Sequence, residues 1–170
     1  MNIINNSLIN QIKDNGSVNC LLEFKNNFLL SGNSINDIFL WDINSNINCI
    51  SKFSGHKKSI NSLVKCLDNF FASASDDETI KIWNYEQNKE LEKEMAHKGP
   101  VLCMILLKNG DLCTGSEDKT IKTWDWQKGQ CKNTIDVEQN SIRCLYELDD
   151  GTLLSGSNEK LIQVWKEFKK

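Results

Sequence analysis

The chain has 170 residues and a net charge of −3. This length is enough for one domain that buries about two-thirds of the surface of its unfolded chain. Acidic and basic residues are mixed and Arg143 is the single arginine, so neither a nucleic acid nor a membrane surface is indicated as a ligand. Seven cysteines without paired spacing, an Asn-rich start unlike a signal peptide, and apolar runs far short of the ~20 residues of a membrane span lead us to expect the cytoplasm or nucleus.

One β-hairpin pattern occurs four times along the chain. Each copy is a short strand, a polar turn, and a second strand in which apolar and polar residues alternate up to a final tryptophan. The copies are Leu29–Trp41, Phe71–Trp83, Leu112–Trp124 and Leu153–Trp165. The tryptophans are 42, 41 and 41 residues apart, and a period of roughly 40–45 residues is typical of the four-stranded blades of propellers.

In chain order, each repeat is predicted to contain four strands. The first strands are expected at Ser17–Phe24, Ser59–Cys66, Pro100–Leu107 and Ser141–Leu148. The hairpins supply the second strands at Phe28–Gly32, Phe70–Ser75, Asp111–Ser116 and Thr152–Ser157, and the third strands at Asp37–Ile43, Thr79–Tyr85, Thr120–Trp126 and Lys160–Lys166. The fourth strands are expected at Ile47–Phe53, Glu90–Met95 and Gln130–Ile135. Between first and second strands, Asn109-Gly110 and Asp150-Gly151 predict two-residue type I′ turns.

The two ends of the chain bear on the architecture. The fourth repeat lacks a fourth strand, whereas Ser7–Ile12 aligns with the position of one. We therefore predict one domain, 1–170, with four four-stranded antiparallel blades at about 14–54, 55–95, 96–136 and 137–170, and with 7–12 completing blade four. Three arrangements stay open: a compact four-bladed ring, a homodimer that forms an eight-bladed ring, and an open arc that is half of a larger propeller or is completed by a partner.

The residues around these hairpins resemble the WD40 repeat family, over nearly the whole chain. The family's marks are the pairs Gly55-His56 and Ala96-His97 before the first strands and the pairs Trp41-Asp42, Trp83-Asn84 and Trp124-Asp125 at the ends of the third strands. The resemblance implies an all-β propeller fold that serves as a rigid platform for binding other proteins or peptides.

Two repeats carry a histidine, a hydroxyl residue and an aspartate that together suggest a catalytic triad. A triad does not recur every 41 residues, because one site needs one nucleophile beside one oxyanion hole. The family resemblance implies instead a structural tetrad whose members hydrogen-bond within a blade. The tetrads are His56, Ser73, Asp77 and Trp83 in the second repeat, and His97, Thr114, Asp118 and Trp124 in the third.

The first and fourth repeats depart from the tetrad pattern. Asp14 and Glu138 occupy the histidine position, and Ile35 and Glu159 occupy the aspartate position, so we expect looser terminal blades.

Cysteines also recur with the repeat, which predicts small buried fillers rather than metal ligands. The equivalent sets are Cys20, Cys103 and Cys144 in first strands, and Cys49 and Cys131 in fourth strands. Trp126 is expected to pack on its strand, with an exposed anchor as the alternative. No metal site and no cofactor is expected.

In propellers that resemble this chain, partners bind the face formed by the loops before the first strands and between the second and third strands. Carried over by position, the contact residues are Asn19, Asn61, Asp76, Leu102, Glu117, Arg143 and Asn158. Phosphopeptide-reading propellers place several arginines on this face, so one arginine beside two carboxylates favours a basic or neutral polar ligand.

The resemblance therefore implies a non-catalytic scaffold or adaptor for proteins or peptides. The alternative is a substrate-recognition or regulatory subunit of an enzyme complex, such as a ubiquitin ligase or a kinase. A hydrolase is disfavoured because the repeat accounts for every candidate catalytic residue, and a nucleic-acid scaffold is disfavoured by the charge.

Overall fold

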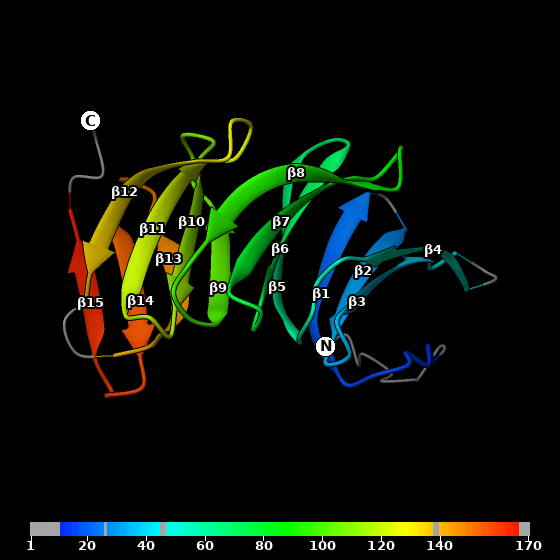
Figure 1. Cartoon of the computed structure of the whole chain (residues 1–170), viewed down its shortest axis with the longest axis horizontal. Coiled ribbons are helices and arrows are strands. Elements are labelled where there is room, and N and C mark those ends of the chain that lie inside the picture. Colours follow the sequence, from blue (N-terminus) through cyan, green and yellow to red (C-terminus); the bar gives the residue numbers. More distant parts are fainter. Residues whose placement is uncertain (1–10, 26, 45–46, 138–139, 167–170) are drawn as a thin grey trace, which may run out of the picture.

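The structure is a computed structural model that describes residues 11–25, 27–44, 47–137 and 140–166. These residues form fifteen strands in four antiparallel sheets (Figure 1). Sheet 1 contains β1 (Val18–Lys25), β2 (Phe28–Asn33), β3 (Asp37–Asp42) and β4 (Asn48–Ser54). Sheet 2 contains β5 (Ile60–Leu67), β6 (Phe70–Ser75), β7 (Thr79–Asn84) and β8 (Lys89–Ala96). Sheet 3 contains β9 (Val101–Leu106), β10 (Leu112–Ser116), β11 (Thr120–Asp125) and β12 (Gln130–Asp136), and sheet 4 contains β13 (Ile142–Glu147), β14 (Leu153–Ser157) and β15 (Ile162–Trp165).

The repeat of the sequence is a repeat of strand register. The first residue of each hairpin copy pairs with its tryptophan in all four sheets, as Leu112 pairs with Trp124 in sheet 3. In β7, Ile80 and Ile82 are buried and Lys81 between them is half-buried, because successive side chains of a strand point to opposite faces of the sheet. The predicted strands are confirmed to within two residues at each end.

The type I′ turns are a wrong prediction. Gly110 and Gly151 have φ of +88° and +83°, but Asn109 and Asp150 before them are not in the left-handed region. The amide of Gly110 donates to the carbonyl of Leu107 at 2.8 Å, so the loop is a turn that ends in a left-handed glycine. This longer loop still brings β9 and β10 into register, because the left-handed residue restores the twist of the hairpin.

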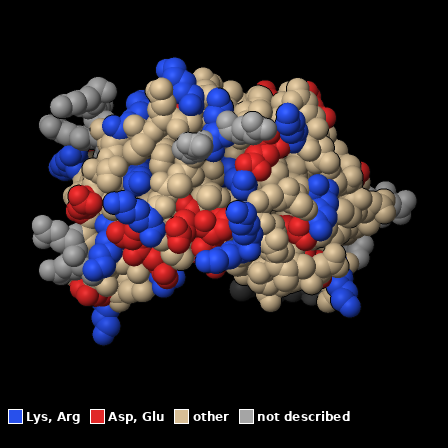
Figure 2. All heavy atoms as spheres, in the orientation of Figure 1, with Lys and Arg blue, Asp and Glu red and all other residues tan. Residues whose placement is uncertain are grey.

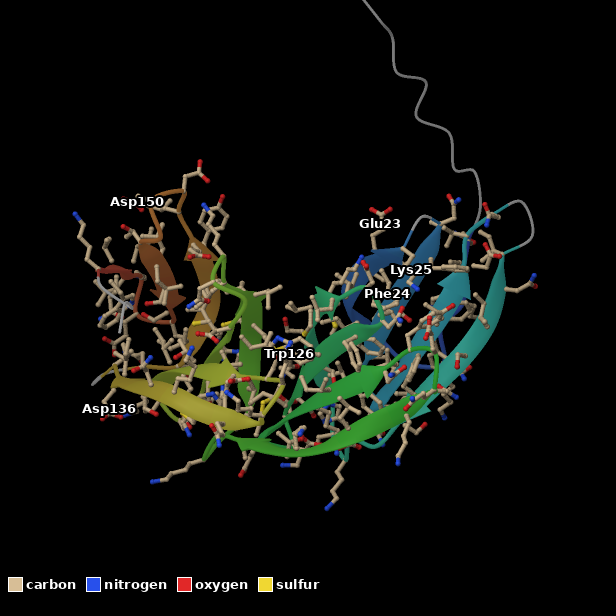
Figure 3. The ribbon with its side chains drawn as sticks, turned by 90° about the horizontal axis from the view of Figure 1, so that it is seen from above. Glu23, Phe24, Lys25, Trp126, Asp136 and Asp150 are labelled. Atoms are coloured by element: carbon tan, nitrogen blue, oxygen red, sulfur yellow. The ribbon has the colours of Figure 1, made fainter. Side chains whose placement is uncertain are left out.

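The sheets stand side by side in an arc. The first strands β1, β5, β9 and β13 are neighbours in that order, and the fourth strands β4, β8 and β12 lie on the convex side (Figure 3). Lys and Arg are interspersed with Asp and Glu over the convex face, with no large region of one sign (Figure 2). Among the described residues there is no helix long and apolar enough to cross a membrane.

Three hydrophobic clusters hold the arc together, one at each junction between neighbouring sheets. Phe24, Leu30 and Phe53 of sheet 1 pack against Phe71 and Trp83 of sheet 2. Equivalent clusters join sheets 2 and 3 and sheets 3 and 4. The core therefore consists of three separate layers of apolar side chains, each between two neighbouring sheets. Each sheet thus contacts chiefly the sheets next to it.

The described chain is an open arc, with sheets 1 and 4 at opposite ends (Figures 1 and 3). Of the three arrangements that the sequence left open, the compact four-bladed ring is therefore not the one observed. Sheet 4 has three strands among the described residues. The predicted completing strand Ser7–Ile12 lies largely outside them, and its described residues, Gln11 and Ile12, are not in a strand.

Candidate functional site

Sheets 2 and 3, the two middle sheets of the arc, each contain four polar side chains that are connected by hydrogen bonds. In sheet 2, His56 Nδ1 lies 2.9 Å from Asp77 Oδ2 and His56 Nε2 lies 2.6 Å from Ser73 Oγ. The indole Nε1 of Trp83 donates to the same hydroxyl at 2.8 Å. The linkage begins in the loop before β5, passes through β6, and ends on β7.

Sheet 3 repeats this arrangement with nearly the same distances. His97 lies 2.9 Å from Asp118 and 2.7 Å from Thr114 Oγ1, and Trp124 donates to that hydroxyl at 2.9 Å. Asp118 also accepts from Thr120 Oγ1 at 2.6 Å and from the backbone amide of Lys98 at 2.8 Å.

The environment of these groups suits structure better than catalysis. Burial lowers the pKa of His97, against the nearby charge of Asp118. Burial opposes the charge of Asp118 as well, but the hydrogen bonds from Thr120 and Lys98 and the neighbouring His97 outweigh it and hold the pKa of Asp118 at about 2. The hydroxyls of Ser73 and Thr114 are fully buried between an imidazole and an indole, so no substrate atom has access to them.

Sheet 1 uses different residues at the same place. Asp14 accepts from Ser31 Oγ at 2.7 Å and from Asn33 Nδ2 at 2.8 Å, while Trp41 donates to Ser31 at 2.9 Å. Asn33 Oδ1 in turn accepts from the amides of Ile35 and Asp37. Sequence reasoning missed Asn33. The signal was present, because Asn33 aligns with Ser75 and Ser116 of the middle sheets.

Sheet 4 retains half of this network in its described residues. Trp165 Nε1 donates to Ser155 Oγ at 2.9 Å. Glu138, at the histidine position, lies outside the described residues, and Glu159, at the aspartate position, is exposed.

The seven predicted contact residues lie along one edge of the arc, where the first strands begin and the β2–β3, β6–β7, β10–β11 and β14–β15 loops turn (lower edge in Figure 1). We call this edge the contact rim. Asn19 donates to Ser59 Oγ at 2.7 Å and to the carbonyl of Ile60 at 3.0 Å, across the junction of sheets 1 and 2. Asn61 likewise donates to the carbonyl of Val101 across the next junction, at 3.0 Å, and to Asp76 Oδ1 at 2.7 Å.

At the other end of the contact rim, charged side chains join sheets 3 and 4. Arg143 Nε donates to Asn158 Oδ1 at 2.9 Å, and Arg143 Nη2 lies 3.7 Å from Glu117 Oε1 on sheet 3. Arg143 and Glu117 are both half exposed. Leu102, between these groups along the rim, is half-buried. The predicted residues thus form a row that crosses all four sheets. Several of them also form hydrogen bonds or ion pairs between neighbouring sheets.

Trp126 is buried and does not form an exposed anchor. Its ring contacts Phe70 of sheet 2 with centroids 5.8 Å apart, and its Nε1 donates to the carbonyl of Gly110 at 3.2 Å (Figure 3).

The cysteines follow the filler prediction only in part. All seven lie in the described residues and none is paired with another. Burial raises the pKa of the Cys20 and Cys103 thiols to about 12. Cys49 and Cys131, however, are exposed on the outer strands, because the fourth strands have no sheet over their outer side, and Cys144 is exposed on sheet 4. The described residues contain no cluster of His, Cys, Asp and Glu that could hold a metal ion.

The model of the WD domain, G-beta repeat family matches residues 47–84, 88–125 and 129–166. These segments make up more than half of the chain, which therefore belongs to the WD40 repeat family. Each matched segment begins with the fourth strand of one sheet and ends with the third strand of the next.

The chain is similar to short parts of longer proteins. It is 33% identical over 81 residues to a WD repeat-containing protein WDS homolog of Arabidopsis thaliana, which covers 45% of this chain and 16% of that protein. It is 33% identical over 66 residues to the F-box/WD repeat-containing protein sel-10 of Caenorhabditis elegans, with 39% and 11% covered. It is 40% identical over 53 residues to the tRNA (guanine-N(7)-)-methyltransferase non-catalytic subunit wuho of Drosophila yakuba, with 31% and 12% covered.

Solved structures agree with the fold. The WD40 β-propeller domain of Doa1 superimposes with a TM-score of 0.82 at 28% identity over 92% of this chain and 53% of that one. The computationally designed Ika4 protein gives a TM-score of 0.80 at 26% identity over 95% and 98%.

Proposed function

We propose that this chain is a non-catalytic scaffold that binds proteins or peptides along the contact rim. WD40 domains are generally platforms for protein interaction, as the family membership indicates. The observation that carries the proposal is the row of exposed and half-buried polar side chains across four sheets, from Asn19 to Asn158. These side chains stand on a framework whose internal polar groups are buried and hydrogen-bonded, so the rim is rigid and preorganised for binding.

The charges of the rim favour a basic or neutral polar ligand. Asp76 adds a carboxylate near the middle of the row, and the positive charge of Arg143 is already shared with Glu117. A phosphate group would need guanidinium groups that are free to bind it in a bidentate manner. A lysine-containing or polar peptide segment suits the rim better than a phosphorylated one.

The test is a pull-down with the quadruple variant Asp76→Ala, Leu102→Ala, Glu117→Ala and Arg143→Ala, analysed by mass spectrometry. We expect loss of the partners that the wild-type chain captures, because these four side chains supply most of the rim's charge and its apolar contact. The matched control is Leu67→Ala, Asp68→Ala, Glu86→Ala and Lys128→Ala, which removes the same classes of side chain from the opposite edge. An unchanged partner list for the rim variant would overturn the proposal.

A second candidate function is a substrate-recognition or regulatory subunit of an enzyme complex, such as a ubiquitin ligase or a kinase. The names of two relatives, an F-box/WD repeat protein and a non-catalytic methyltransferase subunit, favour it. In that case the captured partners would include a catalytic subunit, and the purified complex would show its activity. A partner list without any catalytic subunit would favour the simple scaffold.

The same proposal includes an intracellular site of action, without a cofactor, a metal or a nucleic-acid ligand. Seven unpaired cysteines fit a reducing compartment. The buried, twice-repeated tetrads fit a chain that performs no chemistry of its own.

A further inference from the structure

Neighbouring sheets pack by the same contact at each junction. A β-branched residue at the start of a first strand inserts over a small residue on the second strand of the preceding sheet. A Cβ on Gly32 would lie 2.7 Å from Cγ2 of Ile60, and one on Gly115 would overlap Ile142. Ala74 and Val101 occupy the same places at the middle junction.

Sheet 4 presents the same socket without an insert. A Cβ on Gly156 would meet only Cys144 Sγ within 4 Å among the described residues. Beside this socket, Ile162 pairs with Gly156 and is 77% exposed, whereas its equivalents Ile38 and Ile121 are fully buried.

The rest of this face of sheet 4 is apolar as well. Val164 is 58% exposed, and its equivalent Leu40 is fully buried at the junction with sheet 2. Tyr146 is 64% exposed. The face therefore has the composition of a junction surface, with nothing packed on it in the described structure.

Sheet 1 carries the complementary insert at the other end of the arc. Val18 is equivalent to Ile60 and Ile142, which are fully buried in their sockets, but Val18 is 47% exposed. Leu21 is 60% exposed, whereas its equivalent Leu63 is buried against sheet 1.

We propose that two copies of this chain associate head to tail, with sheet 4 of each copy packing on sheet 1 of the other. The argument is one of continuity: in each of the three junctions of this chain, a face like that of sheet 4 is covered by a face like that of sheet 1. Val18 of the second copy would fill the socket at Gly156, and Ile162 would be buried beside it. Because the two copies each contribute four sheets and the two contacts are identical, the closed assembly is an eight-bladed ring with two-fold symmetry.

Charge at the corner of this junction supports the pairing. Lys108 Nζ bridges sheets 3 and 4 by binding Asp149 at 2.8 Å. At the proposed junction, the equivalent positions are Asp149 of one copy and Lys25 of the other. The opposite charges would again face each other, with the signs exchanged.

The assembly also explains the open side of sheet 4. An exposed apolar face of this kind favours non-specific association unless it is covered. Packing against a second copy would bury Ile162 and Val164 in a closed particle rather than leave them exposed. This proposal does not depend on what the contact rim binds.

Sedimentation velocity and light scattering test the association. We expect a mass of about twice 19.4 kDa for the wild-type chain. Ile162→Lys and Val18→Glu should each shift the protein to the single mass, with dimerisation at least about 100-fold weaker, because each places an unpaired charge in both junctions. Both side chains are exposed in the single chain, so the variants should keep their β-sheet circular dichroism.

The matched control is Leu67→Lys on sheet 2. Leu67 is exposed like the others, and its equivalents in sheets 1 and 3 are Lys25 and Lys108, so this variant should keep the double mass.

Mixing the two monomeric variants gives the decisive outcome. In a mixed dimer, one junction would bring the introduced lysine against the introduced glutamate, and the other junction would be wild type. The mixture should therefore regain the double mass. A wild-type chain that stays at the single mass at every concentration would overturn the proposal. So would a head-to-tail polymer without a closed size, or a mixture that stays monomeric.

Discussion

Asp118 illustrates how single side chains are placed in this protein. Its carboxylate gathers hydrogen bonds from Thr120 and Lys98 and lies against His97, and the β10–β11 loop holds it there. Its neighbour Glu117 points to the contact rim and meets Arg143. Adjacent residues thus divide between framework and candidate site, because the β10–β11 turn directs Asp118 towards His97 and Glu117 towards Arg143.

The tetrads predict how stability depends on pH. In the folded chain the pKa values of His97 and Asp118 are both lowered, so the unfolded chain binds more protons than the folded chain as the pH falls. The free energy of unfolding should therefore decrease below about pH 6.5, as His97 is protonated in the unfolded chain, and decrease further from about pH 4 towards pH 2 through Asp118.

Asp118→Asn isolates the carboxylate in this prediction. The variant should be less stable than wild type at neutral pH, and the difference should shrink below about pH 4, where the wild-type carboxylate in the unfolded chain is protonated. Urea denaturation across this pH range measures both curves. A difference that does not change with pH would show that the charge of Asp118 is not what stabilises sheet 3.

At the scale of elements, the fit between sheets depends on the sizes of paired residues. Gly115 of β10 lies directly under Ile142 of β13 and beside Cys103 of β9. At the middle junction, the equivalent residues are an alanine and the smaller Val101. The volume at each junction is therefore conserved by compensating choices rather than by one residue type.

Gly115→Ala should cost about 2 kcal/mol of stability, because its Cβ overlaps Ile142 and overpacks the junction of sheets 3 and 4. Adding Cys103→Ser and Ile142→Val to this variant reproduces the set found at the middle junction, which is Ala74, Ser62 and Val101. This triple variant should recover much of the loss, because both residues that the new Cβ overlaps are then replaced by their counterparts at the middle junction. Chemical denaturation measures both variants. If the two further substitutions only added to the loss, the socket description of the junction would be wrong.

At the scale of the whole molecule, the arc should be least stable at its ends. Sheets 2 and 3 are covered on both faces, whereas sheets 1 and 4 each pack on one neighbour in the single chain. An array of sheets that contact only their neighbours unfolds locally from its ends.

Native-state hydrogen exchange on the monomeric variant Ile162→Lys tests this gradient. Amides of β14 and β15 should exchange faster than those of β10 and β11, because opening sheet 4 breaks one junction and opening sheet 3 breaks two. Equal protection in all four sheets would mean that the arc unfolds as one cooperative unit instead.

The sequence by itself determined the sheets and their register. The period of the tryptophans and the alternation within each hairpin are local patterns, and strand pairing follows them because a slip of one residue would turn every apolar side chain to the wrong face. The row of candidate contact residues came from the family resemblance, which was carried over to equivalent positions within the repeat.

Only the tertiary structure decided how the sheets are arranged and which polar groups meet. The curvature of the arc depends on side-chain volumes across sheet junctions, such as Gly115 against Ile142, which lie far apart in the chain. The pairing of Arg143 with Glu117, the use of Asn33 in sheet 1 and the exposure of Cys49 likewise depend on neighbouring sheets. A local pattern specifies which residues form a strand, but packing between strands specifies what each side chain touches.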